Sequence, residues 1–242
     1  GVLTSLLINE PVLEDDDVPS QSFFPFTKEL LVKYKDDERV GIICGMNNLG
    51  EIDSPYSYTF GKTGSIWGWA TCKRNVDLWD ENYSWLDDRY SFSKLKDMLG
   101  KKKYIEYVKR ATNHRNTGKA HYETILGASV RLNSQLNIIP SKNLISNIGI
   151  GSDSTHAVDS IDKVPKGIRR VLFMKTYELE FPLKHPKYVL EDIEYKSKLD
   201  RIMGNGYPMV QLYRVVESIF YRALSGDFSS IIKGLKRRLN VN

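Results

Sequence analysis

The chain has only two cysteines among its 242 residues, and this scarcity excludes a scaffold held together by disulfides. Cys44 and Cys72 both lie in apolar or aromatic surroundings, where a free cysteine behaves as a small buried hydrophobe. We therefore predict two structural thiols in a reducing compartment.

The sequence also lacks a long apolar run, since none approaches the roughly 18 residues that cross a bilayer. No basic-then-apolar leader opens the chain, and it contains no internal repeat or low-complexity segment. Its 41% hydrophobic and 27% charged residues are typical of globular proteins. We expect one α/β domain rather than two small ones, soluble or peripheral to a membrane, in the cytoplasm.

Positive charge is missing from the front of the chain. Residues 1–27 contain five acids and no lysine or arginine, although the net charge of the chain is +5. Residues 101–119 carry seven basic residues against the single acid Glu106, and four more cations follow Asp227. The composition of residues 1–27 predicts an acidic site near the start of the chain. Phosphate binding by the basic stretches is one interpretation, but a charge run is usually a solvated helix face.

Hydrophobic periodicity predicts the secondary structure. Short apolar runs predict three buried strands, at residues 11–13, 40–44 and 136–140. Apolar positions at helical spacing predict three helices, at residues 23–35, 94–110 and 122–132. Ser22 is expected to cap the first helix, with Pro25 in its first turn. We interpret residues 54–88 as loops around a short helix, and residues 148–156 as a flexible polar loop.

Four consecutive acids, Glu14, Asp15, Asp16 and Asp17, follow the first apolar run. Ligands gather at the carboxyl ends of strands in open α/β sheets, so a site is expected here. Hard divalent cations prefer carboxylate oxygens, and such a cation stabilises the charge on a departing diphosphate. An acidic run alone is more often a solvated face. Its position between a strand and a helix favours a metal site.

Residues 14–24, Glu-Asp-Asp-Asp-Val-Pro-Ser-Gln-Ser-Phe-Phe, resemble the signature of bacterial hemolytic-protein-like nucleotide-diphospho-sugar transferases. Three further blocks are similar to that family and follow its order: residues 66–71, 143–149 and 181–186. More distantly, the spacing from the acids to Phe23-Phe24 resembles the N-acetylglucosaminyltransferase of N-glycan processing, which has the GT-A fold.

The resemblance implies an α/β, GT-A-like mixed sheet flanked by helices, and an inverting glycosyltransferase. Such an enzyme moves a sugar from a nucleotide-diphosphate donor to a glycan or lipid-linked acceptor. Asp16 would coordinate Mn²⁺ or Mg²⁺, while Glu14 and Asp15 would contact the nucleotide sugar. In the family the βαβ units that hold the base precede the acidic motif, so we expect this chain to be N-terminally truncated. Residues 1–190 would be the metal- and acceptor-binding part, and 191–242 a C-terminal helical extension.

Two more residues acquire roles through the same resemblance. The family's Trp-Asp-Tyr-Gln-Trp block is similar to residues 122–126, which places Glu123 where the aspartate falls, as the general base for the acceptor hydroxyl. Residues 151–156 resemble Gly-Glu-Asp-Ala-Thr-His, so His156 would complete the metal shell or touch the diphosphate. The plainer interpretations are a surface glutamate at a helix start and a solvated loop histidine.

Trp67 and Trp69 flank a glycine, and broad ring faces of this kind can stack on a sugar in an acceptor-binding site. In an extended segment the two side chains point in opposite directions. We therefore expect one tryptophan in the core and the other in the acceptor pocket, without assigning which.

The end of the chain combines an apolar helical face with cations. Residues 228–239 therefore predict an amphipathic helix that rests on an anionic membrane surface, where lipid-linked acceptors reside.

Three other functions are compatible with parts of the sequence. A two-metal nuclease or phosphatase needs carboxylates from several separated segments, and beyond Asp153 and His156 no later cluster is evident. A pI near 9.0 suggests nucleic-acid binding, but the aromatics and cations occupy different segments, so no nucleic-acid partner is expected. A catalytically inactive truncated relative that binds a glycan or a partner protein stays open.

Overall fold

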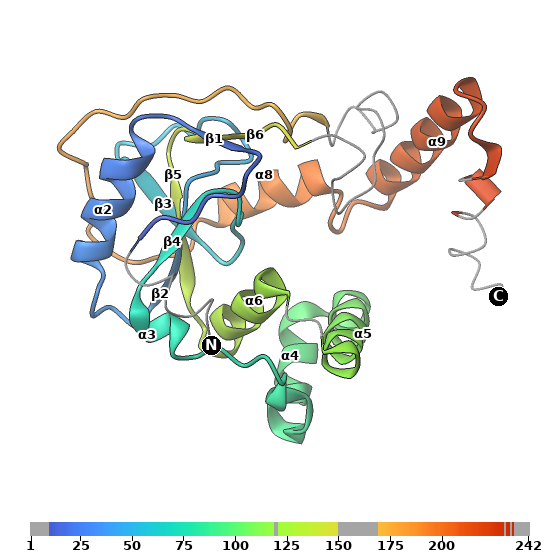
Figure 1. The fold of residues 1–242 in the computed structure, drawn as a ribbon, viewed down its shortest axis with the longest axis horizontal. Coiled ribbons are helices and arrows are strands. Elements are labelled where there is room, and N and C mark those ends of the chain that lie inside the picture. The colour runs from blue at the N-terminus through green and yellow to red at the C-terminus, as the bar shows by residue number, and fades with distance from the viewer. Residues whose placement is uncertain (1–9, 119–120, 150–168, 230, 233, 235–242) are drawn as a thin grey trace.

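A four-stranded mixed sheet forms the centre of the computed structural model, which describes residues 10–118, 121–149, 169–229, 231–232 and 234 (Figure 1). Its strands, in spatial order, are β3 (Tyr58–Gly61), β5 (Leu136–Pro140), β2 (Val40–Cys44) and β4 (Trp69–Thr71). The inner strands β2 and β5 are parallel, and each edge strand runs antiparallel to its neighbour. The prediction of an α/β protein with a mixed sheet flanked by helices is confirmed.

A second, two-stranded sheet carries the segment after the acidic run. Strand β1 (Asp17–Pro19) pairs antiparallel with β6 (Ile145–Asn147). The predicted buried strand at 11–13 is wrong: Val12 makes one bridge to Trp69, and Leu13 is 37% exposed. Pairing stops because the chain turns at once, the Asp17 amide donating to the Glu14 carbonyl at 3.1 Å.

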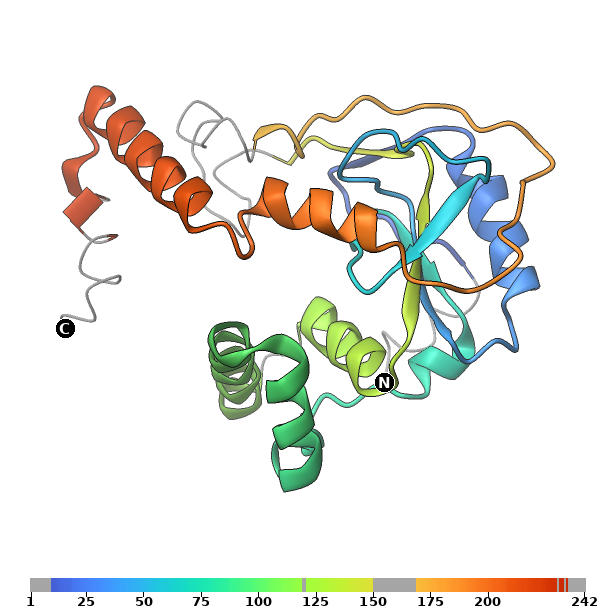
Figure 2. The same ribbon diagram turned by 180° about the vertical axis from the view of Figure 1, so that it is seen from behind.

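Helices cover both faces of the central sheet (Figures 1 and 2). Helix α2 (Phe23–Lys33) lies on one face, and α6 (Tyr122–Leu132) and α8 (Ile193–Met203) lie on the other. Within β2, Ile43 packs in the cluster that includes α2, whereas Ile42 packs in the cluster that includes α6. A strand buried on both faces has to be continuously apolar, as β2 is.

Most of the confirmed elements are those with strong apolar patterns. The strands at 40–44 and 136–140 and the helix at 122–132 have the predicted bounds, and the first helix ends two residues early, at Lys33. Pro25 does lie in its first turn. Ser22 occupies the N-cap position, but its hydroxyl donates to Glu178 instead of capping the helix.

The interpretation of residues 54–88 as loops around a short helix is wrong in part. The segment contains the edge strands β3 and β4, helix α3 (Lys73–Val76) and the 3-10 helix η1 (Ser84–Leu86). Both strands are short and lie at a glycine, so the sequence shows no clear alternation of apolar and polar residues there. Their aromatic residues Tyr58, Phe60 and Trp69 are nevertheless buried.

The predicted helix at 94–110 is two helices, α4 (Arg89–Leu99) and α5 (Lys101–Thr117). Gly100 separates them with a φ of +73°, a backbone conformation that glycine adopts without strain. The start of α4 is set by Asp88, whose carboxylate accepts the amides of Tyr90 and Ser91. Together with η1 these helices pack against the side of α6 that carries Ile125.

An extended segment, residues 174–192, crosses from α2 to β3 and is here called the strap (Figure 1). Its Glu178 carboxylate accepts the amides of Gln21 and Ser22 at 3.2 and 2.8 Å. Farther along, the carbonyl of Lys184 accepts the amide of Ser57 at 2.9 Å. The strap therefore joins the start of α2 to the edge of the sheet.

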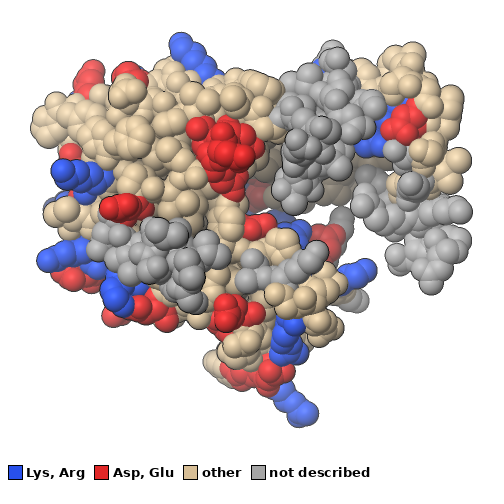
Figure 3. Space-filling view, in the orientation of Figure 1, with Lys and Arg blue, Asp and Glu red and all other residues tan. Residues whose placement is uncertain are grey.

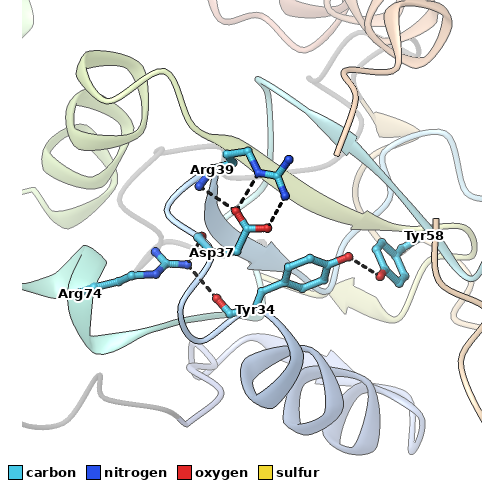
Figure 4. A network of polar contacts seen from close by, with 5 residues as sticks. All are labelled: Tyr34, Asp37, Arg39, Tyr58 and Arg74. Carbon is cyan, nitrogen blue, oxygen red and sulfur yellow. Dashed lines mark hydrogen bonds and ion pairs between the residues drawn. The ribbon is translucent and has the colours of Figure 1, made fainter. Parts of the chain in front are cut away.

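The turn between α2 and β2 is held by a network of polar contacts (Figure 4). Arg74 donates to the carbonyls of Tyr34 and Asp37 at 3.0 and 2.6 Å, and Arg39 forms a two-point contact with the Asp37 carboxylate. Arg39 therefore lowers the pKa of Asp37. The Tyr34 hydroxyl continues the network to Tyr58 at 2.7 Å.

Helix α9 (Pro208–Leu224) follows α8 and projects away from the sheet (Figures 1 and 2). Among the described residues, no helix is both long and apolar enough to cross a membrane. Cys44 and Cys72 are free and buried, as predicted.

Candidate metal centre

The acidic turn is positioned by the pairing of β1 with β6. Asp17 lies opposite Asn147 in that register, and the Asp16 carbonyl accepts the amide of Ile148 at 2.9 Å. The side-chain amide of Asn147 donates to the carboxylates of both Asp16 and Asp17, at 2.9 and 3.2 Å. One asparagine therefore sets the direction of two neighbouring carboxylates.

Asp17 anchors the turn. Its Oδ2 accepts the amides of Gly68 and Glu14, at 2.8 and 3.1 Å, and its side chain is buried. Burial raises the pKa of Asp17 in spite of these hydrogen bonds. Sequence reasoning gave Asp17 no role of its own, and only its position at the start of a strand could have pointed to one.

The Asp16 carboxylate lies against the backbone of Gly149. A Cβ added at Gly149 would come within 1.7 Å of Asp16 Oδ2, so a larger residue there would displace this carboxylate. The Gly149 amide donates to the carbonyl oxygen of the Asn147 side chain at 3.1 Å, which fixes the glycine beside the turn. The end of the 143–149 block thus shapes the surroundings of Asp16.

Three carboxylates of the turn come together. Glu14, Asp16 and Asp17 each have an oxygen within 4.8 Å of the others, and in the described part of the chain no other His, Cys, Asp and Glu residues form such a group. Asp15 is exposed and lies outside the group. Figure 3 shows a compact acidic patch on this face, where the turn before β1 lies in Figure 1.

Glu14 connects this group to α6. The Tyr122 hydroxyl, at the start of α6, donates to Glu14, and the Tyr122 ring stacks on buried Trp69 with centroids 6.2 Å apart. Burial raises the pKa of Glu14, and the charges of Asp17, Asp16 and Glu123 raise it further against the opposing hydrogen bond. The start of α6 therefore faces the acidic turn.

Glu123 lies in the first turn of α6 and is exposed. Glu123 follows Tyr122, whose hydroxyl donates to Glu14, so its carboxylate belongs to the end of α6 that faces the acidic turn, and its charge raises the pKa of Glu14. His121 Nδ1 lies 3.9 Å from Glu123 Oε1, and the His121 ring contacts His114 with centroids 4.2 Å apart. Neither histidine was assigned a role from the sequence, because no metal-ligand spacing marked them.

The two tryptophans differ in burial. Trp69 is 1% exposed and belongs to the cluster under α6, whereas Trp67 is partly buried at the edge of the α2 cluster. Between them Gly68 has a φ of +58°, and its own amide holds Asp17. Trp69 is thus the core residue of the pair, which leaves Trp67 as the candidate for the acceptor pocket, and that role stays a prediction.

His156 and Asp153 lie outside the described residues, as does most of the predicted membrane helix at 228–239. The basic stretch after residue 100 forms α5, where Lys103 lies 3.8 Å from Asp200 of α8.

Comparison with known proteins yields no relative. No protein-family model matches the chain, and neither a curated protein nor a solved structure is significantly similar to it.

Proposed function

We propose that this chain is the metal- and acceptor-binding part of a nucleotide-sugar-dependent glycosyltransferase with a GT-A-like fold. The observation that supports it most is the group formed by Glu14, Asp16 and Asp17 beside the start of α6. The contacts between the similar blocks also support it. Residues 14–24 contact the 66–71 block through Gly68 and the 143–149 block through Asn147.

The donor set of the turn suits a hard divalent cation, because all its groups are carboxylate oxygens. Asp16 and Glu14 would hold Mn²⁺ or Mg²⁺, and Asp17 would keep the turn in shape through its backbone contacts. A cation bound there supplies charge stabilisation for a departing nucleotide diphosphate. Exposed Asp15 is left to contact the nucleotide sugar, the role first expected of it together with Glu14.

Glu123 would remove the proton from the attacking acceptor hydroxyl, which an inverting transfer needs on the face opposite the leaving group. The carboxylates of the turn are poorly suited to this task, because their charge is committed to the cation. Glu123 follows Tyr122, which contacts Glu14, but it lies outside the metal group, and it is exposed, so an acceptor can reach it. Trp67 would offer its ring to the acceptor sugar.

The experiment that tests this function is calorimetric titration of the chain with Mn²⁺, alone and with UDP. We expect Asp16→Asn to weaken Mn²⁺ binding about tenfold or more, since a hard cation loses a charged ligand. The matched control is Asp36→Asn, which neutralises an aspartate with an 85% exposed side chain in the turn after α2. Equal Mn²⁺ affinities for the parent and Asp16→Asn would contradict the proposed metal centre and, with it, the proposed transferase function.

A further inference from the structure

Helix α9 carries an apolar stripe on its outside. Its apolar side chains recur at spacings of three and four residues, which places them on one face. The outer stripe consists of Met209, Leu212, Tyr213, Val216, Phe220 and Leu224, each exposed by 58% to 75%. An exposed patch this continuous marks an interaction site more often than a chance surface.

The opposite side of α9 is the one that meets the rest of the protein. Glu217 is only 8% exposed, and the Arg214 guanidinium donates to the carbonyl of Ile202 at the end of α8. Gln211 donates to the carbonyl of Gly204 in the connection between the helices, at 2.7 Å. The polar side of α9 thus faces inward and the apolar side outward, the reverse of a helix that packs on its own core.

Charge indicates what covers the stripe. Residues 208–242 contain six basic residues and two acids, Glu217 and Asp227. Glu217 is buried, and Asp227 lies 3.4 Å from the Arg222 guanidinium. Beyond Asp227 the sequence has four cations and no acid: Lys233, Lys236, Arg237 and Arg238. An apolar face followed by a stretch of sequence rich in cations complements a surface that is apolar inside and anionic outside.

We propose that the outer stripe of α9 docks on an anionic phospholipid surface, with the helix lying in the plane of the membrane interface. Tyr213 and Phe220 fit this position, because aromatic side chains are favoured at the boundary between hydrocarbon and water. A second copy of the chain is the weaker occupant, since two such ends would bring their cations together. The proposal extends the membrane contact predicted from the sequence for residues 228–239 to α9, and it does not depend on sugar transfer.

The experiment is flotation of the full chain with phosphatidylcholine vesicles, with and without phosphatidylglycerol. We expect binding to the anionic vesicles that weakens with salt. Val216→Glu, in the middle of the stripe, is expected to lower the bound-to-free ratio about tenfold, because it introduces a charge where apolar area is buried. The control is Val32→Glu, the same change at a 69% exposed valine of α2, and it should bind as the parent does.

A second variant separates charge from apolar contact. Replacing Lys236, Arg237 and Arg238 by serine leaves the stripe intact and should reduce binding to the anionic vesicles toward the level seen with phosphatidylcholine alone. Sedimentation of the same proteins without vesicles tests whether a second copy of the chain covers the stripe instead. Absence of flotation at low salt, equal flotation of Val216→Glu and Val32→Glu, or a dimer that Val216→Glu dissociates would each overturn the proposal.

Discussion

Asp17 shows how one buried carboxylate can organise a turn. It accepts hydrogen bonds from two backbone amides and from the Asn147 side chain, which come from three separate segments of the chain. A buried acceptor of this kind is costly to replace, because its donors then lose their partner away from water. Asp17 should therefore matter for folding stability as well as for the geometry of Asp16 and Glu14.

We expect Asp17→Asn to lower the free energy of unfolding by about 1–3 kcal/mol, since an amide cannot accept at both oxygen positions. Urea denaturation measures this change. Asp15→Asn, in the same turn but exposed, should change stability by no more than about 0.5 kcal/mol. Equal unfolding midpoints for Asp17→Asn and Asp15→Asn would show that the hydrogen bonds of Asp17 are dispensable.

Glu123 is the residue on which the proposed chemistry depends. Loss of a general base lowers a rate by about 10²–10⁴, so Glu123→Gln should lower kcat for sugar transfer by that factor while donor affinity changes little. Glu106→Gln, at an exposed position of α5, is the control and should transfer at the parental rate. Parental activity in Glu123→Gln would reassign the base, with Asp153 the next carboxylate to test.

At the scale of elements, the strap is fastened by a chain of polar contacts that includes a histidine. His185 Nδ1 lies 3.0 Å from the hydroxyl of Tyr58 in β3, and its Nε2 lies 3.1 Å from the carboxylate of Glu29 in α2. Burial and the charge of Lys33 lower the pKa of His185 below 6.5, outweighing the opposing effect of Glu29. Folding therefore favours the neutral imidazole at the junction of strap, strand and helix.

The sign of the pH dependence follows from this shift. The unfolded chain binds a proton at His185 more readily than the folded chain, so the stability present above pH 6.5 is lost as the pH falls through the lowered pKa. We expect the free energy of unfolding to be smaller at about pH 5.5 than at about pH 7.5. His185→Gln should reduce that difference, as measured by urea denaturation at both pH values.

His114 is the internal comparison for this measurement. Its pKa is also lowered, first by burial and then by His121, but it lies in α5, with its ring against His121 at the start of α6. His114→Gln should therefore remove a separate part of the pH dependence. If His185→Gln left the difference between the two pH values unchanged, the strap would not be linked to this titration.

At the scale of the whole molecule, the structure separates a sheet that positions the acidic turn from a helix that projects outward. The turn is held by β1, β6 and the loop before β4, whereas α9 is attached through the end of α8. A change in the outer stripe of α9 should therefore leave Mn²⁺ binding at the turn unaltered. The two proposals can fail independently for this reason.

Elements with strong local patterns could be predicted from the sequence. Strand β2 is continuously apolar, and α6 repeats apolar residues at helical spacing, so their bounds were predicted correctly. The edge strands β3 and β4 were missed, because short strands rich in glycine and aromatics owe their form to their neighbours rather than to their own alternation. Gly100 divides the helix predicted at 94–110 into two. The sequence did not reveal this break, because a single glycine in a basic run is only a weak signal for the end of a helix.

The sequence by itself determined the apolar strands and helices, the two buried thiols and the presence of four acids ahead of α2, because each depends on neighbours along the chain. Only the tertiary structure decided which acids converge. It placed Glu14, Asp16 and Asp17 together, left Asp15 exposed, and brought Asn147, Gly68 and Tyr122 to them from distant segments. These contacts arise from the pairing of β1 with β6 and the packing of α6, and no local pattern encodes them.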